Sequence, residues 1–497
     1  MAEATTQLAV DGVGRRTGAA IIRSSLLSML AIAALGITRL VHLSVIGRSV
    51  PEGDPHWSAL VALIGVTMTA GLFLPGGLAS AAGKFIPYHL GRNDLATAQS
   101  VHKLLAWAGY VGALVLAVMV GLIALASYPI SGLDAFAVGL LTFVFSGYSV
   151  EKAALYGFHR IEGYVRLELA GSVLAIVSTI VLVVMGWTAY LTPLILGYTV
   201  LIIGTWVLLP RPAKTPAVRI EDKKEIIGYV VLASIGGLAS AGLLQALPAI
   251  ASVFTTHVEV LHFGYAVSLV APLYFLPRAL GLALFPAMAH AHGAGDLESV
   301  RQQADLTTRA LFVLLAPLFA VAIVLSRQVL GIVFGWQFGD GAFVLQLLLA
   351  ATFMMVTQVA AVNALSSGSP RDVRVPVTWS VVAGSIGVLV AIPLGLALGG
   401  SGVGLAYLLA AAISSIGPLS AVSRAHGLDW RGPVLRSLAV VALAMLLWQG
   451  FQMLPVTAWL SDLSGAVVAG GLGVLILRRD IAHVLSATPW RFRRAAS

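Results

Sequence analysis

Long apolar stretches recur along the whole chain, and the short segments between them carry most of the polar and charged positions. A bilayer core about 30 Å thick is spanned by about 20 helical residues, whose backbone hydrogen bonds are satisfied inside the helix. We therefore predict an all-α polytopic membrane protein with about 14 transmembrane helices. The predicted spans are 19–43, 58–83, 104–126, 133–155, 167–186, 189–209, 227–251, 260–285, 310–333, 343–366, 375–398, 402–423, 434–452 and 457–477.

The positively charged residues fall on one side of this predicted arrangement. With the N-terminus in the cytoplasm, 25 of the 30 Lys and Arg residues lie in cytoplasmic segments or in the span ends that border them. Arg48 lies in an outer loop, and Arg23, Arg39, Arg278 and Arg327 fall within spans. Because a wrong number of helices would remove this asymmetry, we predict an even number of spans with both termini in the cytoplasm.

The two halves of the chain look like copies of one six-helix unit. With an offset of 202 residues, Phe73-Leu74-Pro75 aligns with Phe275-Leu276-Pro277, and Asp94-Leu95 aligns with Asp296-Leu297. Since six is even, both copies enter the membrane in the same orientation, which predicts a pseudo-two-fold axis along the membrane normal. The predicted parts are two pseudo-symmetric six-helix lobes at 1–210 and 227–425, a basic cytoplasmic linker at 211–226, and two additional helices with a basic tail at 426–497.

Composition excludes several functional classes. The chain is 59% hydrophobic and 10% charged, whereas soluble domains carry about 25% charged residues. It has no cysteine, which excludes disulfides, thiolate metal sites and cysteine nucleophiles. The net charge of +9 is spread over many loops, which favours membrane topology and anionic lipid over nucleic acid. No set of ligands converges on a metal or phosphate site, so we expect no metal, no cofactor and no enzymatic activity.

The arginines within spans are the most informative polar residues. An arginine at mid-bilayer costs about 2.5–3.5 kcal/mol on insertion scales, so we expect it to face a wet cavity or a partner. Glu151 and Glu168 fall near the cytoplasmic ends of their spans, and no carboxylate falls at mid-membrane, where a cation-coupled exporter would need one. Because the guanidinium group donates two parallel hydrogen bonds to phosphate, we predict an anionic cargo.

Several apolar segments carry a family resemblance. Leu284-Phe285-Pro286 closes the span at 260–285, Val329–Gly335 closes the span at 310–333, Ala342–Leu349 begins the next span, and Leu365–Gly368 ends it. In these segments the chain resembles the multidrug/oligosaccharidyl-lipid/polysaccharide exporter superfamily, and within it the bacterial polysaccharide flippases. Fourteen helices fit the flippase branches better than the usual twelve of the multidrug and toxic compound extrusion branch.

The resemblance implies a function. Such flippases move polyprenyl-diphosphate-linked oligosaccharides from the inner to the outer leaflet of the bacterial cytoplasmic (inner) membrane, for cell-envelope polysaccharide synthesis. The expected partners are this glycolipid, the phospholipid bilayer, and a polysaccharide polymerase or other envelope-synthesis proteins. The chain departs from the related lipid II flippases, because Tyr265-Ala266-Val267-Ser268 stands where they carry Tyr-Ala-Asp-Arg, and their helix 2 arginine pair is missing around Gly76–Ser80.

We predict a set of substrate-binding residues on this basis. Arg39, Arg278 and Arg23 would bind the diphosphate, and Arg327 or Arg48 would meet the head group near the outer mouth. The other candidates are His42, one turn after Arg39, and Gln245, Gln358 and Asn363, which could contact sugar. Snorkelling of Arg23 and Arg327 and structural pairing of Arg278 stay open. The alternative functions are a cation-coupled small-molecule or multidrug exporter, a lipid II flippase, a non-transporting scaffold for cell-wall enzymes, and a membrane glycosyltransferase.

Overall fold

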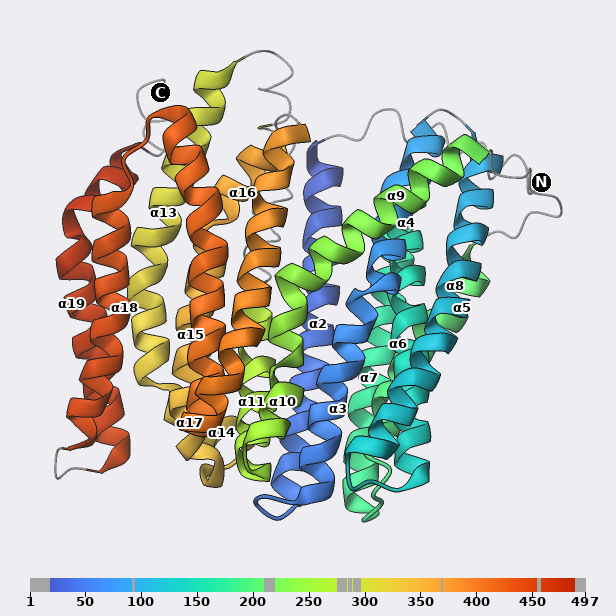
Figure 1. Cartoon of the computed structure of the whole chain (residues 1–497), viewed down its shortest axis with the longest axis horizontal. Helices are drawn as coiled ribbons and strands as arrows, with labels where there is room; N and C mark the ends of the chain where they lie inside the picture. Colours follow the sequence, from blue (N-terminus) through green and yellow to red (C-terminus); the bar gives the residue numbers. More distant parts are fainter. Residues whose placement is uncertain are drawn as a thin grey trace. The chain divides into compact units, whose positions relative to one another are not determined.

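The computed structural model describes residues 18–91, 94–209, 220–274, 284, 288, 296–367, 370–453 and 457–487, and the structural statements below concern these residues. Figure 1 shows that they form helices and no strand. Nine of these helices are long and apolar enough to cross a membrane. Each of the fourteen predicted spans falls largely on helix over its described residues. The predicted all-α polytopic class is therefore confirmed.

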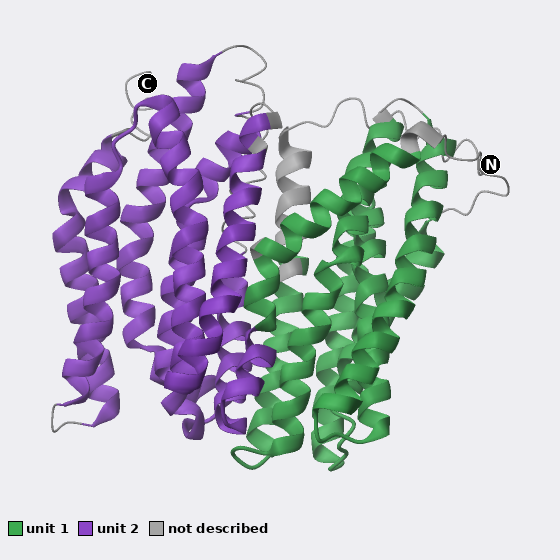
Figure 2. Cartoon of the chain, viewed as in Figure 1, with its two compact units in different colours: residues 1–246 green, residues 247–497 purple. Residues whose placement is uncertain are grey.

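The chain forms two compact units, 1–246 and 247–497, which Figure 2 shows in green and purple. The division falls inside the predicted span 227–251, and the first part of this span packs in unit 1. The helices of unit 1 are α2 (Gly18–Ser49), α3 (Pro55–Leu72), α4 (Leu74–Gly91), α5 (Leu95–Ser127), α6 (Gly132–Gly157), α7 (Ile161–Val184), α8 (Thr192–Leu208), α9 (Ile220–Gly237), the π-helical η1 (Leu238–Gly242) and the start of α10 (Leu243–Phe254).

Unit 2 begins within α10 and ends with the two C-terminal helices. Its helices after α10 are α11 (His257–Val270), the 3₁₀ helix η2 (Ala271–Tyr274), α13 (Leu297–Val324), α14 (Ser326–Phe334), the 3₁₀ helix η3 (Trp336–Gly341), α15 (Ala342–Thr357), α16 (Val359–Ser366), α17 (Pro370–His426), α18 (Arg431–Gln452) and α19 (Ala458–Ala487). Helix α13 packs against α15, α18 and α19, so the C-terminal pair belongs to the body of unit 2.

Polar caps set where several helices begin. The Asp94 side chain accepts a hydrogen bond from the Thr97 amide at the start of α5, and Asp296 does the same for Ser299 at the start of α13. Side-chain acceptors at these positions satisfy amides that lack a partner within the helix. Asp94 and Asp296 are the pair that the predicted internal repeat aligns, and the two helices α5 and α13 start in the same way.

One predicted span differs from the structure and one predicted break agrees with it, each for an identifiable reason. The predicted span 58–83 is two helices, because Pro75 has no amide hydrogen and α3 ends at Leu72, with Phe73 as its C-cap, before α4 begins at Leu74. The predicted spans 375–398 and 402–423 fall on the two helices that make up α17, which are separated by a kink at Gly399, so the predicted break between them is confirmed. Gly399 has φ +58°, a conformation that favours glycine because it has no Cβ.

Helix α6 lies at the centre of the packing in unit 1, where it contacts α3, α4, α5 and α8. Helix α9 packs along α4, and the ammonium group of Lys84 on α4 lies over the rings of Phe85 and Tyr229, 3.5 Å from Glu225. Because α9 begins at Ile220, the last part of the predicted linker 211–226 is helical.

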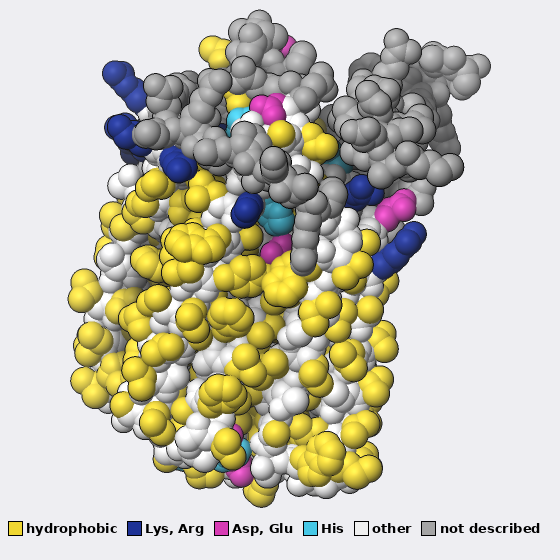
Figure 3. Space-filling model, turned by 90° about the vertical axis from the view of Figure 1, so that its right-hand side faces the viewer, with side chains coloured by type: hydrophobic (Ala, Val, Ile, Leu, Met, Phe, Trp, Pro, Cys, Tyr) yellow, Lys and Arg dark blue, Asp and Glu magenta, His cyan; other side chains and the backbone are white. Residues whose placement is uncertain are grey.

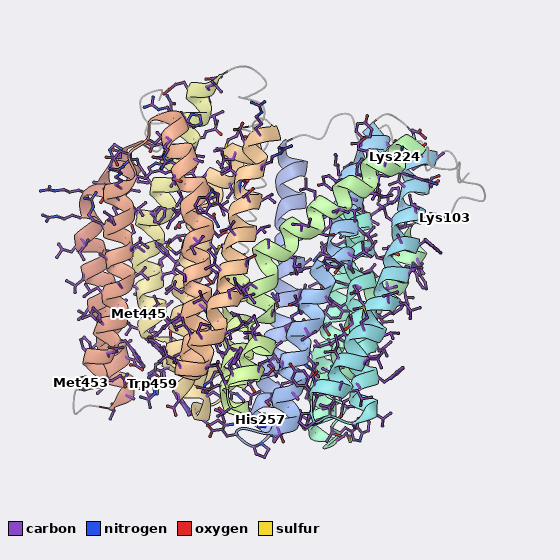
Figure 4. All side chains as sticks on the ribbon, in the orientation of Figure 1. Lys103, Lys224, His257, Met445, Met453 and Trp459 are labelled. Atoms are coloured by element: carbon purple, nitrogen blue, oxygen red, sulfur yellow. The ribbon has the colours of Figure 1, made fainter. Side chains whose placement is uncertain are left out.

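The outer surface fits a lipid environment. Figure 3 shows a broad band of hydrophobic side chains on one face of the molecule, with Lys and Arg gathered towards one end. Within unit 1, Lys103 of α5 and Lys224 of α9 lie at the same end (Figure 4), as the alternation of the predicted spans requires. Within unit 2, the labelled residues His257, Met453 and Trp459 also lie together at one end (Figure 4).

Candidate functional site

Arg39 extends from α2 into the helix bundle of unit 1. Its Nε donates a hydrogen bond to the Tyr198 hydroxyl of α8 at 2.9 Å, and its Nη2 lies 2.9 Å from Met68 Sδ of α3. The guanidinium carbon lies 5.3 Å from the centre of the Phe145 ring on α6 and 5.9 Å from that of Tyr198. Contacts of this kind stabilise a cation among aromatic rings. Three helices therefore hold Arg39 within the interior of unit 1.

The hydrogen-bonding capacity of Arg39 exceeds what its neighbours use. A guanidinium group has five N–H donors, and Tyr198 and Met68 accept two of them. Among the described residues, no carboxylate lies within 4.0 Å of Arg39. A charged group inside an apolar bundle is costly unless it is paired. The arrangement can therefore bind an anion whose oxygens accept the remaining donors.

A second group of polar side chains lies beside Arg39. The Tyr148 hydroxyl of α6 donates a hydrogen bond to Glu168 Oε2 of α7 at 2.9 Å and accepts one from Lys152 Nζ at 3.1 Å. Lys152 also lies over the Tyr148 and Tyr164 rings, 5.3 Å and 5.2 Å from their centres. Glu168 is only 4% exposed. Its charge is thus stabilised by a hydroxyl donor with an ammonium group behind it.

Two tyrosine rings connect these groups. The ring centres of Tyr148 and Tyr198 lie 4.9 Å apart, so Arg39 and Glu168 bind to the hydroxyls of adjacent rings. A cavity of about 10 Å³, lined in part by Glu168 and Tyr198, lies between α2, α7 and α8, and this volume holds about one water molecule. We refer to these five residues as the unit 1 polar cluster: Arg39, Tyr148, Lys152, Glu168 and Tyr198.

His42 does not join this cluster, although it follows Arg39 by one helical turn. Its Nδ1 lies 3.0 Å from Thr179 Oγ1 of α7, and its ring meets the Trp57 ring edge-on at a centre distance of 6.1 Å. Only 1% of His42 is exposed. The imidazole of His42 therefore contacts α3 and α7.

Arg327 lies in a different network, in unit 2. Its Nη1 donates a hydrogen bond to Gln452 Oε1 of α18 at 3.1 Å. Asp462 of α19 accepts hydrogen bonds from Gln452 Nε2 at 2.6 Å and from Gln328 Nε2 at 2.7 Å. This network joins α14 to both C-terminal helices, so the Arg327 side chain contributes to helix packing.

The remaining predicted site residues are spread over both units. Gln245 is half-buried on α10, and Gln358 is buried between α15 and α16, with its Nε2 3.3 Å from Met355 Sδ. Asn363 on α16 has a buried Nδ2 without a hydrogen-bond partner among the described residues. Arg48 is exposed at the end of α2. The Arg23 side chain and all of Arg278 lie outside the described residues.

Two buried carboxylates were absent from the predicted site. Glu168 lies in the third turn of α7, because that helix starts at Ile161, six residues before the predicted span. Glu151 is 1% exposed and accepts hydrogen bonds from Tyr110 at 2.9 Å and Trp206 at 3.3 Å, with His102 Nε2 at 3.2 Å. The sequence carried one signal for the site of Glu168. Tyr148 and Lys152 are four residues apart, which puts a tyrosine and a cation on one face of a helix, where they can stabilise a carboxylate.

Comparison with solved structures shows the same fold in known transporters. A lipid II flippase, MurJ, in an inward closed conformation matches 92% of this chain and 99% of its own length, with a TM-score of 0.63 and 14% identity. An inward-facing multidrug resistance MATE family transporter of the MOP superfamily matches 80% of this chain and 98% of its own, with a TM-score of 0.65 and 15% identity. A mutant form of the Vibrio cholerae MATE transporter VcmN matches 81% and 95%, with a TM-score of 0.59 and 13% identity.

The likeness is one of fold. No protein-family model matches the chain, and no curated protein matches it by sequence. The described helices of this chain and those of the flippase and the MATE transporters nevertheless follow the same arrangement over most of their lengths. The fold expected from the family resemblance is therefore present.

Proposed function

We propose that this chain is a membrane flippase that moves a polyprenyl-diphosphate-linked oligosaccharide across the bacterial cytoplasmic membrane by alternating access. The diphosphate and sugars pass through the polar interior while the lipid tail stays in the bilayer. Transporters built from two repeats commonly bind their cargo near the bilayer midplane and expose the site to each side in turn. The chain then acts as a transporter and catalyses no covalent chemistry.

One observation carries this proposal, namely that among the described residues no carboxylate lies within 4.0 Å of the Arg39 guanidinium inside unit 1. A diphosphate offers several oxygens to a planar donor group, and hydrogen bonds between charged partners are about twice as strong as neutral ones. Arg39 also keeps Tyr198 as a hydroxyl partner that a ligand can replace. Arg278 and Arg23 complete the proposed diphosphate site, Arg327 or Arg48 is proposed to meet the head group, and Gln245, Gln358 and Asn363 are proposed sugar contacts.

The extent of the structural matches supports a flippase. The MurJ match covers 92% of this chain, whereas the MATE transporter matches cited above cover 80% and 81%. The difference is similar in size to α18 and α19, which have 22 and 30 residues. The sequence at Tyr265–Ser268 departs from the charged run expected of lipid II flippases, so we favour another lipid-linked glycan over lipid II as the cargo.

A depletion experiment tests this function. Cells depleted of the protein are treated with an external glycan-cleaving enzyme, and the surviving lipid-linked glycan is measured. The proposal predicts that a polyprenyl-diphosphate glycan accumulates in the protected, cytoplasmic leaflet. Wild type should restore cleavage and Arg39→Ala should not. The matched control is Arg166→Ala, because the Arg166 side chain is 81% exposed and pairs only loosely with Glu162 at 3.9 Å. Unchanged lipid-linked glycans would overturn the proposal.

Glu168 supports one alternative function, a cation-coupled exporter of small molecules. A buried carboxylate among tyrosines could bind and release a proton during transport. The two functions are separated by loading proteoliposomes with a cationic dye and imposing a pH gradient. Dye export that depends on the gradient and is lost in Glu168→Gln would favour the exporter. Glycolipid movement without dye export would favour the flippase.

A further inference from the structure

The two cations of the unit 1 polar cluster are its most accessible members. Arg39 on α2 and Lys152 on α6 are half-buried, whereas Tyr148, Glu168 and Tyr198 are only 3%, 4% and 4% exposed. A small molecule that approaches the cluster therefore meets positive charge, while the carboxylate is covered by its neighbours. Since opposite charges attract and like charges repel, this arrangement favours an anion as the ligand.

One face of α6 connects the two cations. Phe145, Tyr148 and Lys152 are spaced by three and four residues, which puts them on the same side of the helix. The Arg39 guanidinium carbon lies 5.3 Å from the centre of the Phe145 ring, which stacks on the Tyr148 ring at a centre distance of 6.0 Å. Lys152 Nζ lies 5.3 Å from the centre of that Tyr148 ring. Because seven helical residues rise about 10 Å, the cations contact this face about two turns apart, with aromatic rings between them.

Lys152 lies nearer than Arg39 to one end of unit 1. Helix α6 ends at Gly157, and it packs against α5 through a short connection, so α6 ends where α5 starts. Lys103, near the start of α5, lies at the same end as Lys224 (Figure 4). The predicted topology places this end in the cytoplasm. A diphosphate that enters from the inner leaflet therefore reaches Lys152 before Arg39.

Lys152 and Glu168 share the hydroxyl of Tyr148. This hydroxyl accepts a hydrogen bond from Lys152 Nζ at 3.1 Å and donates one to Glu168 Oε2 at 2.9 Å. An ammonium group has three donors, and a tyrosine hydroxyl can donate to any acceptor within reach. A phosphate oxygen bound to Lys152 also comes close to the buried carboxylate, and two anions repel strongly where little water is present. Glu168 therefore limits how tightly this site can hold an anion.

We infer that Lys152 is a second cation of the diphosphate site, and that Glu168 is the internal anion that the diphosphate displaces from the Tyr148 hydroxyl. This inference rests on the flippase function proposed above. Without cargo, Glu168 balances the positive charge of the cluster. With cargo bound, the same carboxylate weakens the hold of the two cations on the diphosphate. Transport requires binding that is favourable enough for entry and weak enough for release, and Glu168 meets the second requirement.

Isothermal titration calorimetry of the purified full chain with farnesyl diphosphate tests this inference. Lys152→Met removes the charge but keeps the side-chain length, and it should bind the probe about tenfold more weakly than wild type, as the loss of one hydrogen bond to a charged group predicts. Lys152→Arg should keep the wild-type affinity. Glu168→Gln removes the competing charge and should bind the probe about tenfold more tightly, a change of similar size and opposite sign.

Two controls accompany these variants. Lys103→Met removes a cation from an exposed position at the same end of unit 1 and should bind farnesyl diphosphate as wild type does. Farnesol has the same hydrocarbon chain without the diphosphate, and its binding should be the same in all of these proteins. The number of sites per chain, measured in each titration, separates a loss of affinity from a loss of folded protein.

Arg39→Ala distinguishes this inference from the function on which it rests. If Arg39→Ala binds farnesyl diphosphate more weakly but Lys152→Met binds it as wild type does, the role of Lys152 is overturned and the proposed function stands. Unchanged or weaker binding by Glu168→Gln would overturn the role of the carboxylate. Equal binding by wild type, Arg39→Ala and Lys152→Met would contradict both the inference and the proposed diphosphate site.

Discussion

The guanidinium Nε of Arg39 and the hydroxyl of Tyr198 are 2.9 Å apart, and this hydrogen bond joins α2 to α8 inside unit 1. The same tyrosine ring lies 4.9 Å from that of Tyr148, which donates its own hydroxyl hydrogen to Glu168. A cation and a carboxylate are thus held near each other by two tyrosines without forming an ion pair. The cation keeps donors for a ligand, and the carboxylate is satisfied by its own partners.

Removing the Tyr198 hydroxyl should weaken unit 1. Tyr198→Phe keeps the ring packing but takes away the hydroxyl acceptor of the half-buried Arg39, and hydrogen bonds to charged groups contribute about 1.5–3 kcal/mol. We expect the free energy of unfolding in detergent to fall by about that amount. Tyr88→Phe, at a site that is 55% exposed, is the control and should change it little. Equal stability of Tyr198→Phe and wild type would show that the bond is not formed in the folded protein.

Glu168 should matter to stability through its hydrogen bonds rather than through its charge alone. Glu168→Ala leaves the Tyr148 hydroxyl without its acceptor, and a buried polar group left unsatisfied costs about 1–3 kcal/mol. Glu168→Gln retains an acceptor oxygen, so we expect a smaller loss. Thermal unfolding of the three proteins under one detergent condition measures the order. A loss as large for Gln as for Ala would contradict this interpretation.

The network around Asp462 should hold the C-terminal helices to α14. Asp462→Ala removes the acceptor shared by Gln328 and Gln452 and should increase hydrogen exchange at the adjoining ends of α18 and α19. The bidentate pair between Arg436 and Asp480, with both distances 2.8 Å, joins the same helices elsewhere and should keep that region protected. Uniform exchange along α18 and α19 would show that the network does not act locally.

Much of the fold was predictable because membrane spans impose a strong pattern on the sequence. The positions of the helices follow from the lengths of the apolar stretches. The break at Pro75 follows from its missing amide hydrogen, and the kink at Gly399 follows from the backbone freedom of glycine. The repeat-related caps Asp94 and Asp296 were visible as aligned residues. A bilayer leaves few alternatives to a helical bundle, so the pattern of apolar stretches was sufficient to predict the fold class.

The candidate site was only partly predictable because it depends on contacts between distant helices. Arg39 stood out as an arginine within an apolar span. Its partner Tyr198, 159 residues later, carries no signal of its own. The direction of His42 also depends on tertiary packing, since residues three apart on a helix share a face only approximately. Glu168 was assigned to a helix end because α7 begins six residues earlier than the predicted span.

The most direct test of the central claim is glycolipid movement in proteoliposomes that contain the purified protein. A fluorescent polyprenyl-diphosphate oligosaccharide is placed in both leaflets, and its access to an external glycan-cleaving enzyme is followed over time. We predict that wild type makes the glycolipid of the inner leaflet accessible to the enzyme. Arg39→Ala should slow this movement about tenfold to a hundredfold, which corresponds to the loss of about 1.5–3 kcal/mol of hydrogen bonding to a charged group. Arg166→Ala should match wild type. Equal rates for wild type, Arg39→Ala and protein-free vesicles would contradict the account.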